Sequence, residues 1–221
     1  MPQPPSRSWH HTKHTWWLKV FAWSLHTGNR LMRKLSPDRK HELFQKLSGR
    51  VLEIGPGPGA NMPLYSEDIT LMAIEPNPFM FRYLRLEAQL AHRNIHLLNG
   101  RAEALCLADG SVDAIVCTHV LCSVDDADAS LSEIMRVLKP GGLFIFLEHI
   151  AAPRGTPLRF FQRVLRPGWR TFGDGCRLDR ELWRTLEYAG FAELTYEHFR
   201  VPWALPVSPH IIGWARKTPT P

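Results

Sequence analysis

A short apolar run ends in a glutamate followed by three alternating glycines. These residues are Glu53, Gly55, Gly57 and Gly59, within the stretch VLEIGPGPGAN. Glycines placed after a strand in this way let a ligand approach bare backbone. The carboxylate argues against a pyrophosphate, because a phosphate at a helix N-terminus is best kept away from other anions. The pattern therefore favours a ligand with a positively charged end and no phosphate.

A second interpretation of the same loop is open. Gly55-x-Gly57-x-x-Ala60 satisfies the loose dinucleotide fingerprint. Glu75 follows about 20 residues later, where an acid that binds a ribose is expected. An NAD-binding domain is therefore an alternative. S-adenosylmethionine (SAM) carries an ammonium group and a sulfonium but no phosphate, so it suits the carboxylate of Glu53 better.

The elements that position this loop follow from hydrophobic periodicity. Apolar residues at helical spacing predict helices over 77–91 and 126–138, and Pro140 with Gly141 ends the second. Alternation of strands and helices over this length predicts a parallel sheet with helices on both faces. Five apolar or β-branched runs predict strands, at 50–54, 69–75, 94–98, 112–118 and 142–149.

The pattern changes on either side of this region. Residues 14–35 predict one or two amphipathic helices that are rich in Trp and basic residues. After residue 150 the pattern predicts helices at 156–169 and 179–191, a tight turn at 173–176, and two closing antiparallel strands at 192–201 and 210–217.

The segment Glu53-x-Gly55-x-Gly57-x-Gly59 resembles the first motif of the class I SAM-dependent methyltransferases. The stretch 100–117 is similar to the family segment that contacts adenine, and RVLKPGGLFIFLEH matches the family's fifth strand. The resemblance implies an α/β, Rossmann-like, doubly wound fold. Its sheet would be seven-stranded and mostly parallel, with an antiparallel last strand and preceding N-terminal helices.

The resemblance also implies the domains and the cofactor site. We expect a methyltransferase domain at 49–217, preceded by an aromatic and basic helical segment at 1–48 that acts as a lid or an interfacial helix. Glu75 would accept hydrogen bonds from the ribose hydroxyls. The expected SAM-binding residues are Glu53, Gly55, Gly57, Gly59, Asn61, Glu75, Pro76, Asn77, Arg101, Ala102, Glu103, Thr118 and His119.

Four further segments are similar to the animal alkyl-thiol S-methyltransferases of the methyltransferase-like group. The resemblance implies transfer of a methyl group from SAM to the sulfur of a small thiol, with S-adenosylhomocysteine as the second product. Methylation of nitrogen or carbon on a phospholipid or quinone-like acceptor is an alternative, and so is a noncatalytic SAM-binding module. The segments are CTHVLCSV (117–124), LEHI (147–150), GDGC (173–176) and VSPHIIGWARK (207–217).

Three residues are candidates for catalysis on the acceptor. A thiol must ionise before it attacks, so a nearby base or positive field would help. His119 and His149 end strands at the edge where substrates bind in open α/β sheets, and Asp174 lies in the GDGC turn. Each also has a structural interpretation: His119 as a packed residue of the SAM pocket, His149 as a hydrogen-bonding partner, and Asp174 as a turn former.

Charge is distributed unevenly along the 221 residues, whose net charge is +6. Residues 51–150 carry six Lys and Arg against thirteen Asp and Glu, whereas both flanks are basic. An acidic centre suits a cationic ligand, and basic flanks suit lipid headgroups, an acidic substrate or solvent. The Trp-rich stretch 14–35 is typical of a core helix, a substrate lid or a peripheral membrane contact. No recognised nucleic-acid module accompanies it, so we expect no nucleic-acid partner.

The remaining expectations concern compartment and assembly. No apolar stretch is long enough to span a bilayer, and the start lacks the features of a signal peptide. The animal alkyl-thiol S-methyltransferases carry a hydrophobic N-terminal anchor, whereas the equivalent region of this sequence is shorter, basic and aromatic. The four cysteines form no C-x-x-C pair, so we expect reduced thiols, no metal site and no disulfide framework. We expect a cytoplasmic monomer or homodimer, with membrane association through residues 14–35 as a further option.

Overall fold

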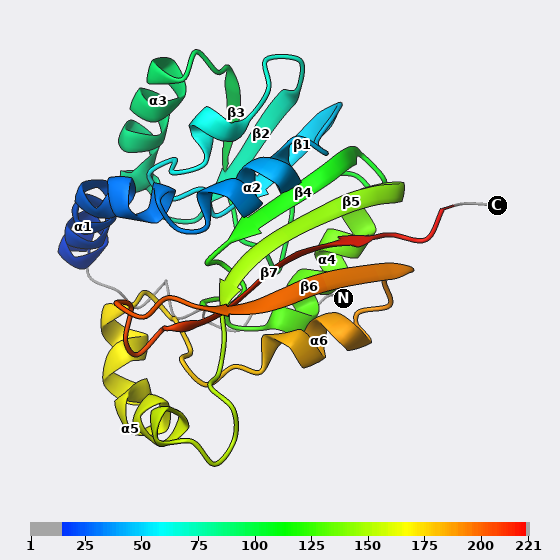
Figure 1. Ribbon diagram of the computed structural model, residues 1–221. Helices are drawn as coiled ribbons and strands as arrows, with labels where there is room; N and C mark the ends of the chain where they lie inside the picture. The colour runs from blue at the N-terminus through cyan, green and yellow to red at the C-terminus, as the bar shows by residue number, and fades with distance from the viewer. Residues whose placement is uncertain (1–14, 220–221) are drawn as a thin grey trace, which may run out of the picture.

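The computed structural model describes residues 15–219, and a seven-stranded sheet forms its centre (Figure 1). The strand order is β3-β2-β1-β4-β5-β7-β6. β7 pairs antiparallel with both β5 and β6, and the remaining neighbours are parallel. This confirms the Rossmann-like fold expected from the sequence. The strands are β1 Arg50–Ile54, β2 Thr70–Glu75, β3 Ile95–Asn99, β4 Val112–Thr118, β5 Leu138–His149, β6 Glu193–Arg200 and β7 Pro209–Arg216.

Helices cover both faces of the sheet, as expected. The N-terminal stretch forms two helices, and the part of the predicted 1–48 segment before Thr15 lies outside the described residues. The α-helices are α1 Thr15–Arg33, α2 Pro37–Phe44, α3 Phe81–Leu90, α4 Ala127–Val137, α5 Pro157–Phe172 and α6 Leu182–Tyr188. Among residues 15–219 there are also two 3-10 turns, η2 Met62–Leu64 and η3 Pro78–Met80.

Two apolar cores follow from the alternation of side chains along each strand. Val51 packs in a core that α2 and α3 cover, with Leu43 and Leu84. Its neighbour Leu52 points to the opposite face and packs in the core under α4 and α6, with Ile134. A strand with both faces buried reads as a continuous apolar run, which is why the sequence predicted β1 and β4 with the observed boundaries.

The connection between β1 and β2 contains no α-helix. Only the short turn η2 forms there. Pro56, Pro58 and Pro63 lack the N–H that an intrahelical hydrogen bond requires, and the glycines between them adopt left-handed backbone angles. The loop therefore crosses the edge of the sheet as irregular backbone, and α2 packs beside it.

Most predicted boundaries differ from the observed ones by one to four residues, and two of these differences lie near the C-terminal half of the sheet. β5 begins at Leu138 rather than at residue 142, because the Gly141–Gly142 backbone pairs with Lys217 at the end of β7. The second helix after residue 150 is shorter than expected and covers Leu182–Tyr188 only. Neither difference moves a strand to another position in the sheet.

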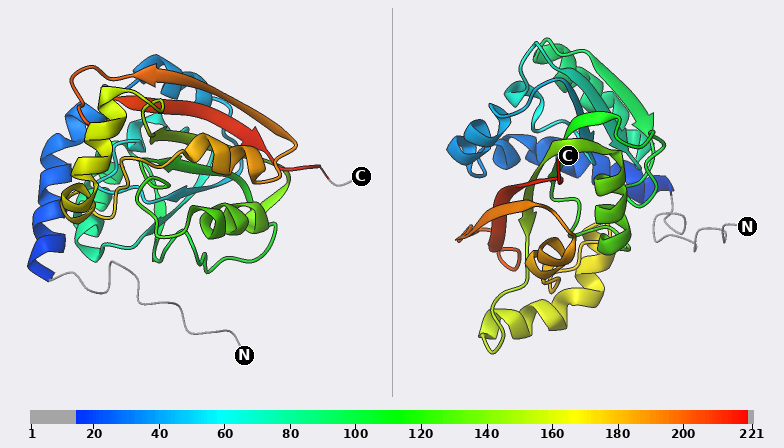
Figure 2. Two further views of the ribbon diagram at one scale, coloured as in Figure 1. Left: turned by 90° about the horizontal axis from the view of Figure 1, so that it is seen from below. Right: turned by 90° about the vertical axis from the view of Figure 1, so that its right-hand side faces the viewer.

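α1 and α5 lie at the edge where the parallel strands end (Figures 1 and 2). Their rings meet edge to face, with Trp17 of α1 at 5.8 Å from Phe172 of α5. Asn77, just after β2, donates a side-chain hydrogen bond of 3.1 Å to the carbonyl of Leu18. These contacts hold α1 across the ends of the strands, far in sequence from the residues that it covers.

Candidate functional site

A cavity of about 450 Å³ lies at the carboxyl edge of the sheet, within the usual range for small-molecule sites. The wall combines the glycine loop, the ends of β2, β4 and β5, one face of α1, and the turn after α5. Eleven of the residues expected from the sequence line it: Gly55, Gly57, Glu75, Pro76, Arg101, Ala102, Glu103, Thr118, His119, His149 and Asp174.

The glycine loop is held by backbone geometry that other residues would not tolerate. Gly55 has φ +60°, and a Cβ there would lie 2.6 Å from a methyl group of Val120. Gly57 has φ +55° and donates its backbone N–H to the carboxylate of Glu75 at 3.0 Å. The loop is thereby fixed to the end of β2, with its backbone facing the cavity.

Glu75 is the buried carboxylate at this end of the cavity. It accepts hydrogen bonds from the backbone N–H groups of Gly57 and of Asn77, the latter at 2.9 Å. Burial raises the pKa of Glu75 to about 7, although both hydrogen bonds oppose that shift. The carboxylate lies on the cavity wall, where a ligand hydroxyl can reach it.

Four of the expected residues do not line the cavity. Glu53 and Asn61 are buried behind the wall, Gly59 packs against Leu84 and Met62, and the backbone of Asn77 donates to Glu75. Asn61 donates from its amide nitrogen to Glu53 Oε1 at 2.8 Å and to the hydroxyl of Thr118 at 2.9 Å. Their direct contact with a ligand stays a prediction.

Lys40 extends this buried group to α2. Its ammonium donates to the side-chain oxygen of Asn61 at 3.2 Å and lines the cavity. Burial lowers the pKa of Lys40 to about 8, and burial raises the pKa of Glu53 to about 7. The hydroxyl of Tyr65 is also close to the Glu53 carboxylate and opposes the effect of burial on the pKa of Glu53.

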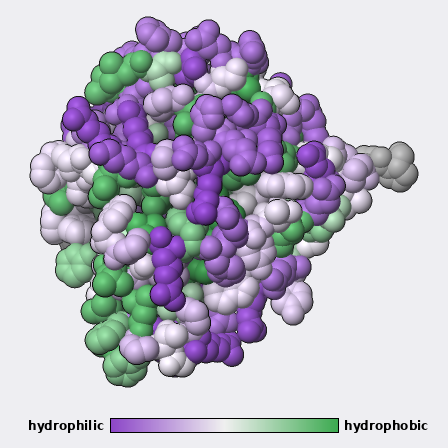
Figure 3. Space-filling model, viewed as in Figure 1, coloured by the Kyte–Doolittle hydropathy of each residue, from purple (hydrophilic) through white to green (hydrophobic). Residues whose placement is uncertain are grey.

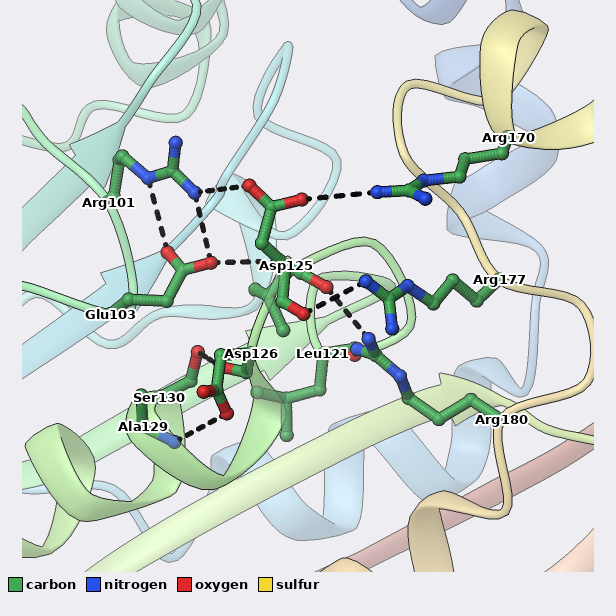
Figure 4. A network of polar contacts seen from close by, with 11 residues as sticks. Arg101, Glu103, Leu121, Asp125, Asp126, Ala129, Ser130, Arg170, Arg177 and Arg180 are labelled. Carbon is green, nitrogen blue, oxygen red and sulfur yellow. Dashed lines mark hydrogen bonds and ion pairs between the residues drawn. The ribbon is translucent and has the colours of Figure 1, made fainter. Parts of the chain in front are cut away.

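Arginines attach the C-terminal half to the loop after β4 (Figure 4). Arg101 bridges the carboxylates of Glu103 and Asp125 at 3.1 and 3.0 Å, and Arg170 at the end of α5 approaches Asp125 at 3.6 Å. Arg180 donates to the backbone carbonyl oxygens of Leu121 and Val124. The last turn of α5 and the segment after it are thereby held against residues 121–125.

Glu148 holds the loop after β4 through hydrogen bonds to its backbone. It is fully buried at the end of β5 and accepts three backbone N–H bonds of 2.8–3.1 Å, from Val120, Leu121 and Cys122. His119, directly before them, has φ +58°, a conformation that costs energy for a residue with a side chain. The hydrogen bonds to Glu148 stabilise this bend and set the direction of His119 and Cys122.

Three imidazole rings gather at this end of the cavity. His119 packs edge to face on His210 with 5.3 Å between ring centroids, and His149 lies 6.3 Å from His210. Burial, with the neighbouring His210 and His149, lowers the pKa of His119 well below its ordinary value. Burial alone would lower the pKa of His149 as well, but Cys122 and the charge of Glu148 outweigh it and raise that pKa.

Two thiols complete this wall. His149 Nε2 lies 2.8 Å from Cys176 Sγ, and the indole N–H of Trp169 donates to the same sulfur at 3.0 Å. Cys122 is also buried there, and burial raises the pKa of its thiol. Asp174, at φ +53°, opens the turn that carries Cys176 into the wall.

Sequence reasoning missed several residues of this site. Lys40, Glu148, Trp169, Arg180 and His210 contribute to its wall or its support, and none was among the expected site residues. Glu148 stands within the LEHI segment and could have been noticed there, as an acid in an apolar run. His210 stands in the VSPHIIGWARK segment, whereas Lys40, Trp169 and Arg180 lie outside the quoted segments.

Comparison with known proteins places the chain among methyltransferases. A methyltransferase domain family matches residues 52–146. Thiol S-methyltransferase TMT1A of Homo sapiens is 42% identical over 195 residues, which cover 81% of this chain and 78% of that protein. Thiol S-methyltransferase TMT1B of Rattus norvegicus is 39% identical, over 83% of this chain and 80% of that protein. A SAM-dependent methyltransferase structure from Thermotoga maritima shares the fold, with TM-score 0.67, 22% identity, and 93% and 100% coverage.

Glu53→Gln tests the buried acid behind the wall. A carboxyl whose pKa is raised on folding stabilises the folded state at low pH, and this contribution is lost as pH rises towards about 7. Glutamine keeps an oxygen for Asn61 but cannot ionise. Between about pH 5 and about pH 8, the melting temperature of the wild type should fall by roughly 5 °C more than that of the variant. Equal pH slopes in calorimetry, with exposed Glu193→Gln as control, would contradict this assignment.

Proposed function

The chain belongs to the SAM-dependent methyltransferases, in the group that contains the thiol S-methyltransferases, and from this membership we propose that it methylates the sulfur of small thiols. SAM is the methyl donor, and S-adenosylhomocysteine is the second product. The observation that carries the thiol assignment is the 42% identity to a thiol S-methyltransferase over 81% of this chain.

The residues of the cavity fit the donor. When bound, SAM supplies a methyl group on a sulfonium, which needs little further activation. Glu75 would accept the ribose hydroxyls, and the bare backbone around Gly57 leaves room for the amino-acid end. Asn29 Oδ1 is a buried acceptor atom that lacks a partner among the described residues. Asn29 lines the cavity, so its oxygen and the carboxylate behind the wall suit an ammonium group.

His119, His149 and Asp174 are the residues that we propose act on the acceptor. All three line the cavity that contains the glycine loop and Glu75, so an acceptor bound beside them lies next to the donor. His119 carries a neutral imidazole at neutral pH, because burial lowers its pKa, so its unprotonated ring nitrogen can accept a hydrogen bond from the S–H group of a bound thiol. Alignment of the sulfur with the methyl group supplies much of the remaining rate.

The exposed face of α5 supports peripheral contact with a membrane. α5 has inverted burial: Arg159 and Gln162 are buried, while Phe160, Phe161 and Val164 are each more than half exposed. Figure 3 shows apolar side chains gathered over this region of the surface. No helix among residues 15–219 is long and apolar enough to cross a bilayer.

Neighbouring groups match an anionic lipid surface. Trp16 and Trp23 of α1 are also exposed, and Figure 2 shows α1 beside α5. Arg163 and Arg166 are exposed among the apolar residues of α5. Aromatic and apolar side chains interleaved with cations are typical of helices that lie in the headgroup region. We propose that α1 and α5 rest together on such a surface, which would let apolar thiols enter from the lipid.

Glu75→Ala tests the donor site. Loss of a buried carboxylate that binds two ribose hydroxyls should weaken SAM binding at least about tenfold, because charged hydrogen bonds each contribute roughly 1.5–3 kcal/mol. Isothermal titration calorimetry measures this Kd, and circular dichroism checks that the variant is folded. Exposed Glu193→Ala is the control and should bind as the wild type does. Unchanged affinity in Glu75→Ala would refute the assignment.

A panel of acceptors tests the acceptor class. With SAM that carries an isotopically labelled methyl group, small alkyl thiols should give the labelled thioether by mass spectrometry. Alcohols and amines of the same carbon skeleton should give none. Product from phosphatidylethanolamine or a quinol, with none from thiols, would favour the lipid or quinone alternative. Tight SAM binding with no product from any acceptor would favour a noncatalytic module.

Sedimentation with vesicles tests the membrane surface. Phe160→Ser with Phe161→Ser should reduce binding to phosphatidylcholine–phosphatidylserine vesicles at least about tenfold, since each buried Phe contributes roughly 1.5–3 kcal/mol. The matched control is Leu86→Ser with Leu90→Ser, which removes exposed apolar residues from α3. Equal binding of both double variants, or no binding by the wild type, would contradict the proposal.

A further inference from the structure

Two thiols and an imidazole meet at the acceptor end of the cavity. They belong to Cys122 after β4, His149 at the end of β5, and Cys176 after α5. We propose that these three side chains bind a zinc ion and that the fourth position of the ion takes the sulfur of the acceptor thiol. The metal site is argued from the geometry alone, while its role in catalysis rests on the proposed function.

The donor atoms are close enough to share one ion. One atom from each of the three residues lies within 4.8 Å of the other two. Tetrahedral zinc, with bonds of about 2.3 Å to sulfur and 2.0–2.1 Å to nitrogen, holds its ligand atoms about 3.5–3.8 Å apart. His149 Nε2 and Cys176 Sγ are 2.8 Å apart and form a hydrogen bond. This pair has to open by less than about 1 Å as zinc replaces the proton.

The backbone holds these ligands in place before any ion binds. The N–H of Cys122 donates to Glu148 at 3.1 Å, directly beside His149 in the chain. The N–H of Arg177 donates to the carbonyl of Cys122 at 2.9 Å, which joins the turn of Cys176 to the loop of Cys122. All three ligand side chains are buried. These bonds fix the backbone at Cys122 and at the turn of Cys176, while His149 Nδ1 has no hydrogen-bond partner among the described residues.

Two neighbouring groups can balance negative charge on the sulfurs once a metal ion has displaced their protons. The indole N–H of Trp169 points at Cys176 Sγ, at 3.0 Å, and can donate to a sulfur that is bound to metal. Arg180 is half-buried and lies close enough to Cys122 and Glu148 for their charges to interact. Its cation offsets negative charge that two thiolates would add to this part of the interior.

The number of ligands indicates a catalytic site rather than a structural one. Structural zinc sites have four protein ligands, whereas catalytic sites have three and keep one position for water or substrate. Cys122, His149 and Cys176 all line the cavity, so a fourth position faces the space beside the donor site. This position is where the acceptor must lie if its sulfur is to reach the methyl group.

The reaction at such a site balances. The thiol binds zinc as its S–H bond breaks, and the proton passes to water. A lone pair of the bound sulfur then forms the new bond to the methyl carbon, while the bond from that carbon to the donor sulfur breaks and its electron pair stays on that sulfur. The neutral thioether is a weak ligand and leaves. Zinc lowers the pKa of a bound thiol enough to deprotonate it, which supplies the nucleophile at neutral pH.

Metal binding by the full chain, without SAM or thiol, tests the site itself. After treatment with a chelator and desalting under a reductant that binds no metal, titration should give one Zn²⁺ per chain. Co²⁺ in its place should show a thiolate-to-metal charge-transfer band. Cys122→Ser and Cys176→Ser should each weaken binding at least about tenfold. Cys106→Ser and Cys117→Ser, outside the cluster, should bind as the wild type does. Absence of stoichiometric binding, or equal affinity in all four variants, overturns the proposal.

Turnover separates this inference from the proposed function. Chelated enzyme should lose at least about tenfold in kcat for thiols and recover with Zn²⁺, while its Kd for SAM stays unchanged. Full thiol turnover by enzyme shown to be free of metal overturns the zinc site and leaves the thiol assignment standing. Stoichiometric zinc binding without product from any thiol leaves the zinc site standing and overturns the thiol assignment. A disulfide between Cys122 and Cys176 that forms in place of metal binding, seen as a loss of two thiols, also overturns the zinc site.

Discussion

Carboxylates buried at the ends of strands hold the loops that form the site. Glu148 on β5 accepts three backbone N–H bonds from the loop after β4, and Glu75 on β2 accepts two from the neighbouring turns. Burying a carboxylate is costly unless hydrogen bonds replace its water. Backbone N–H groups of a sharp loop carry a similar cost when they lack partners. Each carboxylate therefore stabilises its loop while the loop stabilises the carboxylate, and the strand register fixes both.

The C-terminal half depends on this edge of the sheet. Arg170, Arg177 and Arg180 attach to the loop that Glu148 holds, through Asp125 and backbone carbonyl oxygens. α5 is thereby fixed by its end, and it buries polar residues while its apolar side faces outward. The same attachment brings the turn of Cys176 against Cys122. One set of arginines thus accounts for both the exposed apolar helix and the cluster of thiols.

The charges along the cavity divide it into two ends. Glu75 and the buried Glu53 lie at the end of the glycine loop, where a cationic donor is favoured. His119, His149 and the two thiols lie at the other end. Their imidazole nitrogens and soft sulfur atoms suit the chemistry of a thiol. Since a methyl group passes directly between two sulfur atoms in thiol methylation, a single cavity with these two ends is the arrangement that the reaction requires.

The sequence by itself determined where the donor site lies along the chain. It placed β1, the glycine loop and Glu75 at the end of β2, and these features indicated SAM as the methyl donor. These features are local, because a strand, its following loop and its spacing are encoded in consecutive residues. Only the tertiary structure decided that Cys122, His149 and Cys176 meet, since His149 and Cys176 stand 27 residues apart with no motif between them. The absence of a C-x-x-C pair excluded only metal sites built from neighbouring residues. Likewise, the hydrophobic pattern of α5 predicted a helix but not the face it exposes, because burial depends on the distant loop after β4, to which the arginines at and after the end of α5 attach.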